Sequence, residues 1–418
     1  MTSEATDAFV WVWLPRATEP VVAGQLIAEG PRVSFIYGRR YLGRADRMAL
    51  YEPELPLVDQ LTSPLVGDHP GCIADAGPDS WGQRVILNAR FGRQAPGSAD
   101  LGLVDYLLAS ASNRIGALDF QTSATNYVPR SKGEATVDEL ARASEIVDRR
   151  LPLTEELAEA LLRGSSIGGA RPKATLTEDG RQLIAKFASS TDPFPVVQSE
   201  FVAMRLAHLA GLDVARVDVT EALDKRVLLV ERFDRTPDGG RRALVSALTV
   251  LGLSESEGRY ASYADLADVI RARFTDPVPT LRELFGRIVL SILISNTDDH
   301  ARNTAAFWDG AELTLTPAYD LCPQRRAGGE AQQVMTIGRD GWRFSQLAGC
   351  VERANVYNLS ETEAREIIDD QIDTLVGRWH EVCDEAGLTR AERAALWGSQ
   401  FCNPYAFFEY RADAPQPR

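Results

Sequence analysis

The sequence predicts an α+β fold made of several lobes, and three observations lead to this prediction. The chain has 418 residues, which is longer than one compact core usually extends. Strand-like runs bounded by Gly and Pro dominate the first part of the chain, whereas long apolar patterns of helical period follow. Apolar residues make up 44% and charged residues 25%, as in ordinary soluble proteins. We therefore expect an N-terminal β-rich subdomain over 1–125, a lobe of strands with one helix over 126–240 and a helical lobe over 241–418.

Charge and cysteine content exclude several classes of protein. The formal net charge is -14, from 45 basic and 59 acidic residues, so the chain as a whole repels a polyanion and is not expected to bind DNA except through a partner. The five cysteines are scattered without a CxxC pair, which argues against a disulfide framework and a zinc site. The acidic N-terminus does not resemble a signal peptide, and no apolar run approaches the ~20 residues that span a bilayer. We expect a soluble, cytoplasmic protein without membrane contact.

The N-terminal region combines strands and helices. Short β-branched and aromatic runs, separated by Pro and Gly, predict a small antiparallel sheet with strands over 9–14, 21–28 and 33–37. Pro78-Asp79-Ser80 begins a predicted helix that ends at Phe91, and a second helix is predicted over 100–112.

The next part of the chain contains two helix starts, a glycine loop and a hairpin. Thr136 has capping-box spacing to Glu139, Thr154 begins a second helix, and Gly164 ends it. The Ser/Gly cluster 164–169 is therefore a predicted loop. Asp179-Gly180 supplies the positive φ of a tight turn between strands over 173–177 and 182–187.

The remaining elements are mostly helical. Apolar periodicity predicts helices over 197–210, 281–295, 361–386 and 389–397. Strands are predicted over 214–220 and 227–230, and a second hairpin, 305–308 with 312–316, turns at Asp309-Gly310. This hairpin is expected to bring Asn303 and Asp320 near its opposite ends. The polar, proline-containing tail 412–418 is expected to fray.

Three polar residues around the second hairpin form a phosphoryl-transfer set. Asp298 is followed five residues later by Asn303, and Asp320 comes after the hairpin. Phosphoryl transfer needs an aimed hydroxyl and a held Mg²⁺ more than it needs covalent chemistry from the protein. We assign Asp298 as the base that accepts the hydroxyl proton, and Asn303 and Asp320 as oxygen ligands of Mg²⁺.

The same order of parts supplies a nucleotide site. The glycine loop 164–173 comes first, Lys186 on a strand would pair phosphates, and Glu200 on the next helix would orient that lysine. The strand that ends at Val230 would act as a hinge that reads adenine through its backbone. The residues assigned to the nucleotide are Gly168, Gly169, Ala170, Arg171, Lys173, Lys186, Glu231, Phe233, His300, Arg302, Asn303, Tyr319 and Asp320.

Other interpretations of these motifs stay open. Gly164 and Gly169 have the spacing of a Walker A loop, but Ala170-Arg171 stand where that loop needs Lys and a hydroxyl, and a plain turn also fits. Asp298-Asp299-His300 suggests a metal hydrolase, yet the other histidines are isolated. Lys186 and Glu200 taken singly would be solvated surface residues. Arg325-Arg326 is either solvated surface or a receiver of a protein substrate.

Five segments together resemble the HipA family, bacterial serine/threonine kinase toxins. They are Ser165 to Lys173, Ile184 to Phe187, Val230-Glu-Arg-Phe-Asp-Arg235, Asn296-Thr-Asp-Asp-His-Ala-Arg-Asn303 and Thr316-Pro-Ala-Tyr-Asp320, and the resemblance spans nearly the whole chain. It implies a two-lobed, protein-kinase-like fold, ATP and Mg²⁺ as ligands, Asp298 as the catalytic aspartate, and Asn303 and Asp320 on the metal.

The resemblance also implies partners and regulation. HipA-like toxins are held inactive by a helix-turn-helix antitoxin, HipB, the two together repress their operon, and family targets include aminoacyl-tRNA synthetases. The family's regulatory serine matches Ser166, where a phosphate would add roughly -1.5 to -2 charge and repel nucleotide. The loop departs from the best-known member at Arg171-Pro172, which would stiffen it.

These observations lead to one functional hypothesis and one alternative. The hypothesis is a HipA-like kinase that transfers the ATP γ-phosphate to a protein hydroxyl and is restrained by a HipB-like antitoxin. The alternative is a catalytically idle, partner-binding corepressor of a helix-turn-helix protein. An idle protein has no need of Lys186, Asp298, Asn303 and Asp320 together, and this chain has all four.

Overall fold

The computed structural model describes residues 5–91, 101–130, 135–149, 151, 154, 157, 160–161, 171–189, 191–326 and 329–418. The chain forms two compact units. The first comprises Met1–Thr191, Thr220–Val245 and Phe307–Glu312, and the second comprises Asp192–Val219, Ser246–Ala306 and Leu313–Arg418. The three-domain division drawn from the sequence stays a prediction.

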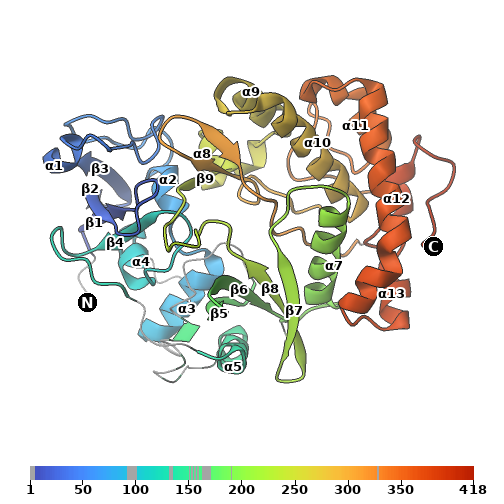
Figure 1. The fold of residues 1–418 in the computed structure, drawn as a ribbon, viewed down its shortest axis with the longest axis horizontal. Helices are drawn as coiled ribbons and strands as arrows, with labels where there is room; N and C mark the ends of the chain where they lie inside the picture. Colours follow the sequence, from blue (N-terminus) through green and yellow to red (C-terminus); the bar gives the residue numbers. More distant parts are fainter. Residues whose placement is uncertain are drawn as a thin grey trace. The chain divides into compact units, whose positions relative to one another are not determined.

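The first unit begins with a four-stranded antiparallel sheet of order β3-β2-β1-β4 (Figure 1). Its strands are β1 Asp7–Val12, β2 Val21–Glu29, β3 Arg32–Tyr37 and β4 Leu118–Gln121. The three predicted strands are confirmed, whereas β4 was missed because it is short. Helix α4 Leu103–Ala109 contacts β1 and β4, and α3 Ser80–Phe91 ends where the sequence predicted. Two single-turn helices, α1 Arg39–Leu42 and α2 Gly71–Ala74, lie between these elements in the sequence.

A second sheet, most of whose residues belong to the first unit, has the order β5-β6-β8-β7. The strands are β5 Lys173–Glu178, β6 Arg181–Phe187, β7 Val217–Ala222 and β8 Lys225–Glu231. The predicted turn at Asp179-Gly180 is confirmed, with both residues at positive φ. One face of the sheet joins an apolar core with α3 and α5 Val137–Asp148, and α5 begins at the predicted capping box of Thr136 and Glu139.

The second unit is mainly helical (Figure 1). Its longer helices are α7 Val196–Leu209, α9 Tyr263–Arg273, α10 Pro277–Leu293 and α12 Glu361–Glu385. Helix α10 is almost entirely buried from Leu284 to Leu293 and packs against α9 and α12, while α12 also packs against α7. Shorter helices are α8 Ala247–Val250, α11 Leu347–Glu352 and α13 Arg390–Leu396.

Two details of the helical part differ from the sequence-based expectations. Helix α10 begins earlier than predicted because proline is favourable in the first helical turn, where its missing N–H is not needed. The C-terminal tail is not frayed, since Trp397 Nε1 donates to the Pro415 carbonyl at 3.1 Å and the Arg418 N–H donates to the Val376 carbonyl at 3.1 Å. The expectation for residues 412–418 was therefore wrong.

The second predicted hairpin forms around Asp309-Gly310. Its strands, β10 Ala305–Trp308 and β11 Leu313–Leu315, belong to a three-stranded sheet of order β11-β10-β9, with β9 at Leu244–Ser246. No helix within the described residues is both long and apolar enough to cross a membrane. All five cysteines are buried and free.

Candidate active site

The first unit places the two predicted nucleotide-site lysines side by side. Lys173 on β5 and Lys186 on β6 are direct cross-strand partners, so their side chains leave the same face of the sheet. The alternate residues Ala174 and Ala185 lie in the apolar core, and the lysines therefore project from the opposite face. Both lysines are buried, and adjacent like charges repel, so this pair requires acidic partners.

Lys173 obtains its acidic partner from the start of helix α3. Its Nζ lies 2.8 Å from Asp79 Oδ2, and the Asp79 Oδ1 accepts the Gly82 N–H at 2.7 Å. Trp81 Nε1 donates to the Lys173 carbonyl at 2.9 Å. The ion pair thus ties the first turn of α3 to the hairpin. The assignment of Lys173 to a nucleotide stays a prediction, and this ion pair across 94 positions is a role that sequence reasoning did not find.

The predicted hinge is held by a buried arginine network. Arg232 binds the Asp234 carboxylate with both Nε and Nη2, at 3.0 and 2.8 Å. The same guanidinium donates to the carbonyls of Asn113 and Arg114 at 3.1 and 2.8 Å. Arg235 adds a second fork, from Nη1 to Asp234 Oδ2 at 2.8 Å and from Nη2 to the Arg114 carbonyl at 2.6 Å. Planar, charge-assisted bonds of this kind are among the strongest in proteins.

Electrostatics make Asp234 the centre of this network. Burial raises the pKa of the Asp234 carboxyl, but Arg232 and Arg235 outweigh it and hold that pKa well below the usual range. The Gly116 N–H also donates to Asp234 Oδ2 at 2.7 Å. Because Glu231 and Phe233 flank Arg232 in the sequence, the network fixes the backbone of the predicted adenine-reading segment against the loop 113–116.

The second unit carries the loop 295–303, called the catalytic loop after the role that the sequence predicts for it. Helix α10 ends at Leu293, Ser295 follows in the left-handed region at φ 52°, and Asp298 is exposed. The Asp298 carbonyl accepts the His300 N–H at 2.9 Å and the Asn303 side-chain Nδ2 at 3.3 Å. The predicted base and the predicted metal ligand Asn303 are therefore joined through one carbonyl.

Two hydrogen bonds join the segment around Asp320 to this loop. The Tyr319 hydroxyl donates to the Arg302 carbonyl at 2.7 Å, and the Gln324 N–H donates to the Ser295 carbonyl at 3.0 Å. Asp320 itself has φ 58°, a conformation that Asp tolerates better than most residues. The structure thus ties Tyr319, directly before Asp320, and Gln324, four residues after it, to the segment that bears Asp298 and Asn303.

The loop also contains buried polar atoms without a hydrogen-bond partner among the described residues. They are Ser295 Oγ, Asn296 Nδ2 and His300 Nδ1. Buried groups of this kind are uncommon and cluster where a protein does something other than pack. Arg302 extends outward and pairs with Glu255, with its Nε 2.7 Å from Glu255 Oε2.

Other predicted residues are distributed over both units. Glu200 is buried on α7 of the second unit, so its pairing with Lys186 of the first unit stays a prediction. Phe233 forms an edge-on contact with Phe307 at 5.9 Å between ring centroids. Ser166, Gly168, Gly169 and Ala170 lie outside the described residues, whereas Arg171 is described and half-buried.

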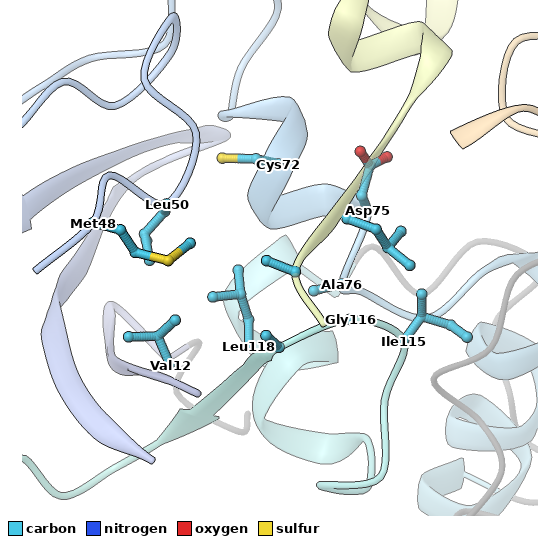
Figure 2. A pocket seen from close by; sticks show the side chains of 12 residues that line it. Val12, Met48, Leu50, Cys72, Asp75, Ala76, Ile115, Gly116 and Leu118 are labelled. Atoms are coloured by element: carbon cyan, nitrogen blue, oxygen red, sulfur yellow. The ribbon is translucent and has the colours of Figure 1, made fainter. Parts of the chain in front are cut away.

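A small cavity in the first unit is not a nucleotide site. Figure 2 shows it between Met48, Leu50, Cys72 and Leu118, with Asp75 as the one labelled carboxylate. Its volume of ≈ 10 Å³ is about enough for one water molecule. In the described part of the chain, no group of three or more His, Cys, Asp or Glu side chains could hold a metal alone.

Sequence reasoning missed Asp299 and Tyr263. The Tyr263 hydroxyl, on α9, donates to the Asp299 carboxylate at 2.5 Å. The available signal was the doublet Asp298-Asp299. Two adjacent loop residues usually lie in different surroundings, so one of the two aspartates could be expected to be buried. Tyr263 had no local signal, since its contact spans 36 positions.

The family model and the curated relatives that match this chain agree on one family. The family described as HipA-like C-terminal domain matches residues 165–379, about half of the chain. A serine/threonine-protein kinase toxin HipA from Shewanella oneidensis is 28% identical over 186 residues, which cover 37% of this chain and 42% of that protein. A putative kinase, Y4mE, from Sinorhizobium fredii is 26% identical over 219 residues, covering 46% of this chain and 50% of that protein. The chain thus matches half or less of the length of these curated relatives.

A solved structure shows the same fold over most of the chain. It is the Shewanella oneidensis MR-1 toxin–antitoxin system, a complex of HipA, HipB and operator DNA, one chain of which has a TM-score of 0.65 and 19% identity. The match covers 90% of this chain and 92% of that chain. It confirms the predicted α+β, kinase-like fold class. On the family match over residues 165–379, the chain belongs to the family of proteins with a HipA-like C-terminal domain.

Proposed function

We propose that the chain is a HipA-like serine/threonine protein kinase that transfers the γ-phosphate of ATP to a protein hydroxyl. One observation carries the proposal: the exposed Asp298 is bonded through its carbonyl to Asn303, in a loop that also accepts a hydrogen bond from Tyr319, the residue directly before Asp320. A base and two oxygen ligands are the parts that phosphoryl transfer needs beside the nucleotide.

The donor set fits Mg²⁺ rather than a softer metal. Asn303 and Asp320 offer an amide and a carboxylate oxygen, and hard cations prefer oxygen ligands. Within the described residues no richer acidic cluster competes for the ion. Mg²⁺ bound by one or two side chains completes its shell with phosphate oxygens and water, so a nucleotide would supply the remaining ligands. When bound, the metal would neutralise charge on the transferred phosphoryl group.

Asp298 would act on the acceptor. Its carboxylate would accept the proton of the substrate hydroxyl and aim the oxygen at the γ-phosphate. The exposed position suits a residue that meets a second macromolecule. In the first unit, Lys186 would pair phosphates from the face of the sheet that it shares with Lys173, and the segment Glu231 to Phe233 would read adenine.

The family and the fold likeness support a partner as well. By analogy with the solved complex of HipA, HipB and operator DNA, a HipB-like helix-turn-helix antitoxin would bind this chain. The net charge of -14 fits contact with DNA through such a partner rather than directly. Phosphorylation of Ser166 in the glycine loop would inactivate the enzyme, and an aminoacyl-tRNA synthetase is the substrate class to test first.

The experiment compares wild type with Asp298→Asn. We expect turnover of radiolabelled ATP onto protein to fall about 10²–10⁴-fold, while isothermal titration still shows Mg·ATP binding. Asp320→Asn should weaken Mg·ATP binding itself. Asp265→Asn changes another exposed aspartate of the second unit and serves as the control with unchanged turnover. Equal turnover by wild type and Asp298→Asn rejects the assigned base, and no turnover by wild type favours the idle corepressor.

A further inference from the structure

The two aspartates of the catalytic loop have opposite surroundings. Asp298 is exposed, whereas Asp299 is 6% exposed. A carboxylate is costly to bury, and the usual solution is a cationic partner. The hydrogen bonds that the structure gives to the Asp299 carboxylate come instead from two neutral hydroxyl groups.

These hydroxyl groups belong to two different helices. The Tyr263 hydroxyl, from the first residue of α9, lies 2.5 Å from Asp299 Oδ2, and Ser291 Oγ, from the last turns of α10, lies 3.3 Å from the same oxygen. Both donors are 1% exposed. The Tyr263 N–H donates to the Thr336 carbonyl at 2.9 Å, so the tyrosine is itself fixed at its backbone. Asp299 therefore connects the loop to α9 and α10 of the second unit.

The anchor acts on the residues that would perform the reaction. Asp298 and His300 are the direct neighbours of Asp299, and the Asp298 carbonyl holds both the His300 N–H and Asn303 Nδ2. A carboxylate fixed at position 299 thus determines where the Asp298 side chain and the Asn303 amide can lie. A misplacement of about 1 Å can cost roughly 10²-fold in rate, so an anchor of this kind matters for turnover more than for binding.

We propose that Asp299 is a positioning residue, which sets the aim of Asp298 and the placement of Asn303 through its bonds to Tyr263 and Ser291. The proposal rests on the kinase function proposed above. It assigns no contact between Asp299 and substrate, metal or nucleotide.

A pair of tyrosines provides the test. Tyr263 and Tyr357 are both 1% exposed, but the Tyr357 hydroxyl donates to the Ile337 carbonyl at 2.7 Å and not to a residue of the catalytic loop. Tyr263→Phe and Tyr357→Phe therefore each remove one buried hydroxyl bond in the second unit. We expect similar shifts in thermal midpoint, but only Tyr263→Phe and Asp299→Asn should lower turnover, by about 10- to 100-fold, with the Kd for Mg·ATP changed less than about twofold.

Hydrogen exchange gives a readout that does not depend on activity. The amides from Asp298 to Asn303 should exchange about tenfold faster or more in Tyr263→Phe than in Tyr357→Phe. Equal exchange and equal turnover in the two tyrosine variants would overturn the proposal. Failure of the proposed function has a different signature, namely wild-type turnover no higher than that of Asp298→Asn, and the exchange rates then still decide whether Asp299 anchors the loop. If Asp299→Asn does not fold, Tyr263→Phe alone decides.

Discussion

Asp234 in the predicted hinge and Asp299 in the catalytic loop are both buried carboxylates, but different groups offset the cost of burying each charge. Asp234 is gripped by the guanidinium groups of Arg232 and Arg235. Asp299 receives two hydroxyl hydrogen bonds, from Tyr263 and Ser291. Burial raises the pKa of both carboxyls, yet for Asp234 the arginines reverse the shift, whereas the pKa of Asp299 stays raised.

The arginine network around Asp234 stabilises the fold, whereas the two hydroxyl bonds to Asp299 position a loop at some cost in stability. Two arginine forks around Asp234 join residues 232–235 to the loop 113–116, which lies about 120 positions earlier. Arg114 in that loop is fully buried, and burial lowers its pKa to about 10, so it too remains charged at neutral pH. The catalytic loop has no such network and keeps three buried polar atoms without partners among the described residues. We infer that the hinge network contributes mainly to the stability of the fold. The bonds of the catalytic loop mainly fix where its residues lie.

The largest effect should come from removing Asp234. Asp234→Ala leaves Arg232 and Arg235 buried without their carboxylate, which typically costs roughly 3–5 kcal/mol of stability. Equilibrium urea unfolding, with hydrogen exchange of the β8 amides to locate the change, measures it. Asp234→Asn keeps the shape and some of the bonds, so its loss should be smaller.

Asp238 is the control for this measurement. It lies in the same segment but is fully exposed, with a side-chain bond to Thr236. Asp238→Ala should leave the urea midpoint near that of wild type. If Asp234→Ala lowered the urea midpoint no more than Asp238→Ala, the hinge network would not stabilise the fold as its geometry indicates.

The pH dependence of stability should have opposite signs at the two carboxylates. The folded-state pKa of Asp234 is depressed, so its contribution is complete above the unfolded value near 3.8 and is lost as pH falls below that value. The folded-state pKa of Asp299 is raised, so stability falls as pH rises from about 3.8 through the folded-state pKa. Urea unfolding of wild type, Asp234→Asn and Asp299→Asn between pH 3 and 7 measures both.

Two distinct trends are expected in these profiles. The free energy of unfolding of Asp234→Asn should approach that of wild type as the pH becomes acidic. The free energy of unfolding of Asp299→Asn should increase relative to that of wild type as the pH rises. If the free energy of unfolding of both variants changed with pH in the same direction relative to wild type, Arg232 and Arg235 would not be the cause of a difference between Asp234 and Asp299.

Local patterns sufficed to predict much of the fold. The Asp179-Gly180 turn, the capping box at Thr136 and the apolar periodicity of α10 each follow from residues within one turn or one helix. Strand β4 and helix α9 were not predicted, because β4 has four residues and α9 has a weak apolar pattern. Their positions depend on packing that neighbouring residues do not encode.

The candidate site divides in the same way. The spacing of Asp298, Asn303 and Asp320 indicated chemistry, and the loop contacts join these segments. The supports were invisible in the sequence, because Lys173 pairs with Asp79 across 94 positions and Tyr263 reaches Asp299 across 36. Long-range partners of this kind require the fold, even where each residue's chemistry is plain.

The smallest effect should come from Ser291, the weaker of the two donors to Asp299. Its 3.3 Å bond is longer than the 2.5 Å bond from Tyr263, so Ser291→Ala should cost no more than about 0.5–1.5 kcal/mol and reduce turnover less than Tyr263→Phe. Ser199→Ala is the matched control, because Ser199 is also buried in a helix of the second unit but donates to the Pro195 carbonyl at 2.8 Å. ATP turnover and urea midpoints of the three variants rank the two donors. A larger loss of turnover in Ser291→Ala than in Tyr263→Phe would show that Ser291 on α10, and not Tyr263 on α9, is the main support of Asp299. The catalytic loop would then be positioned by the helix that precedes it.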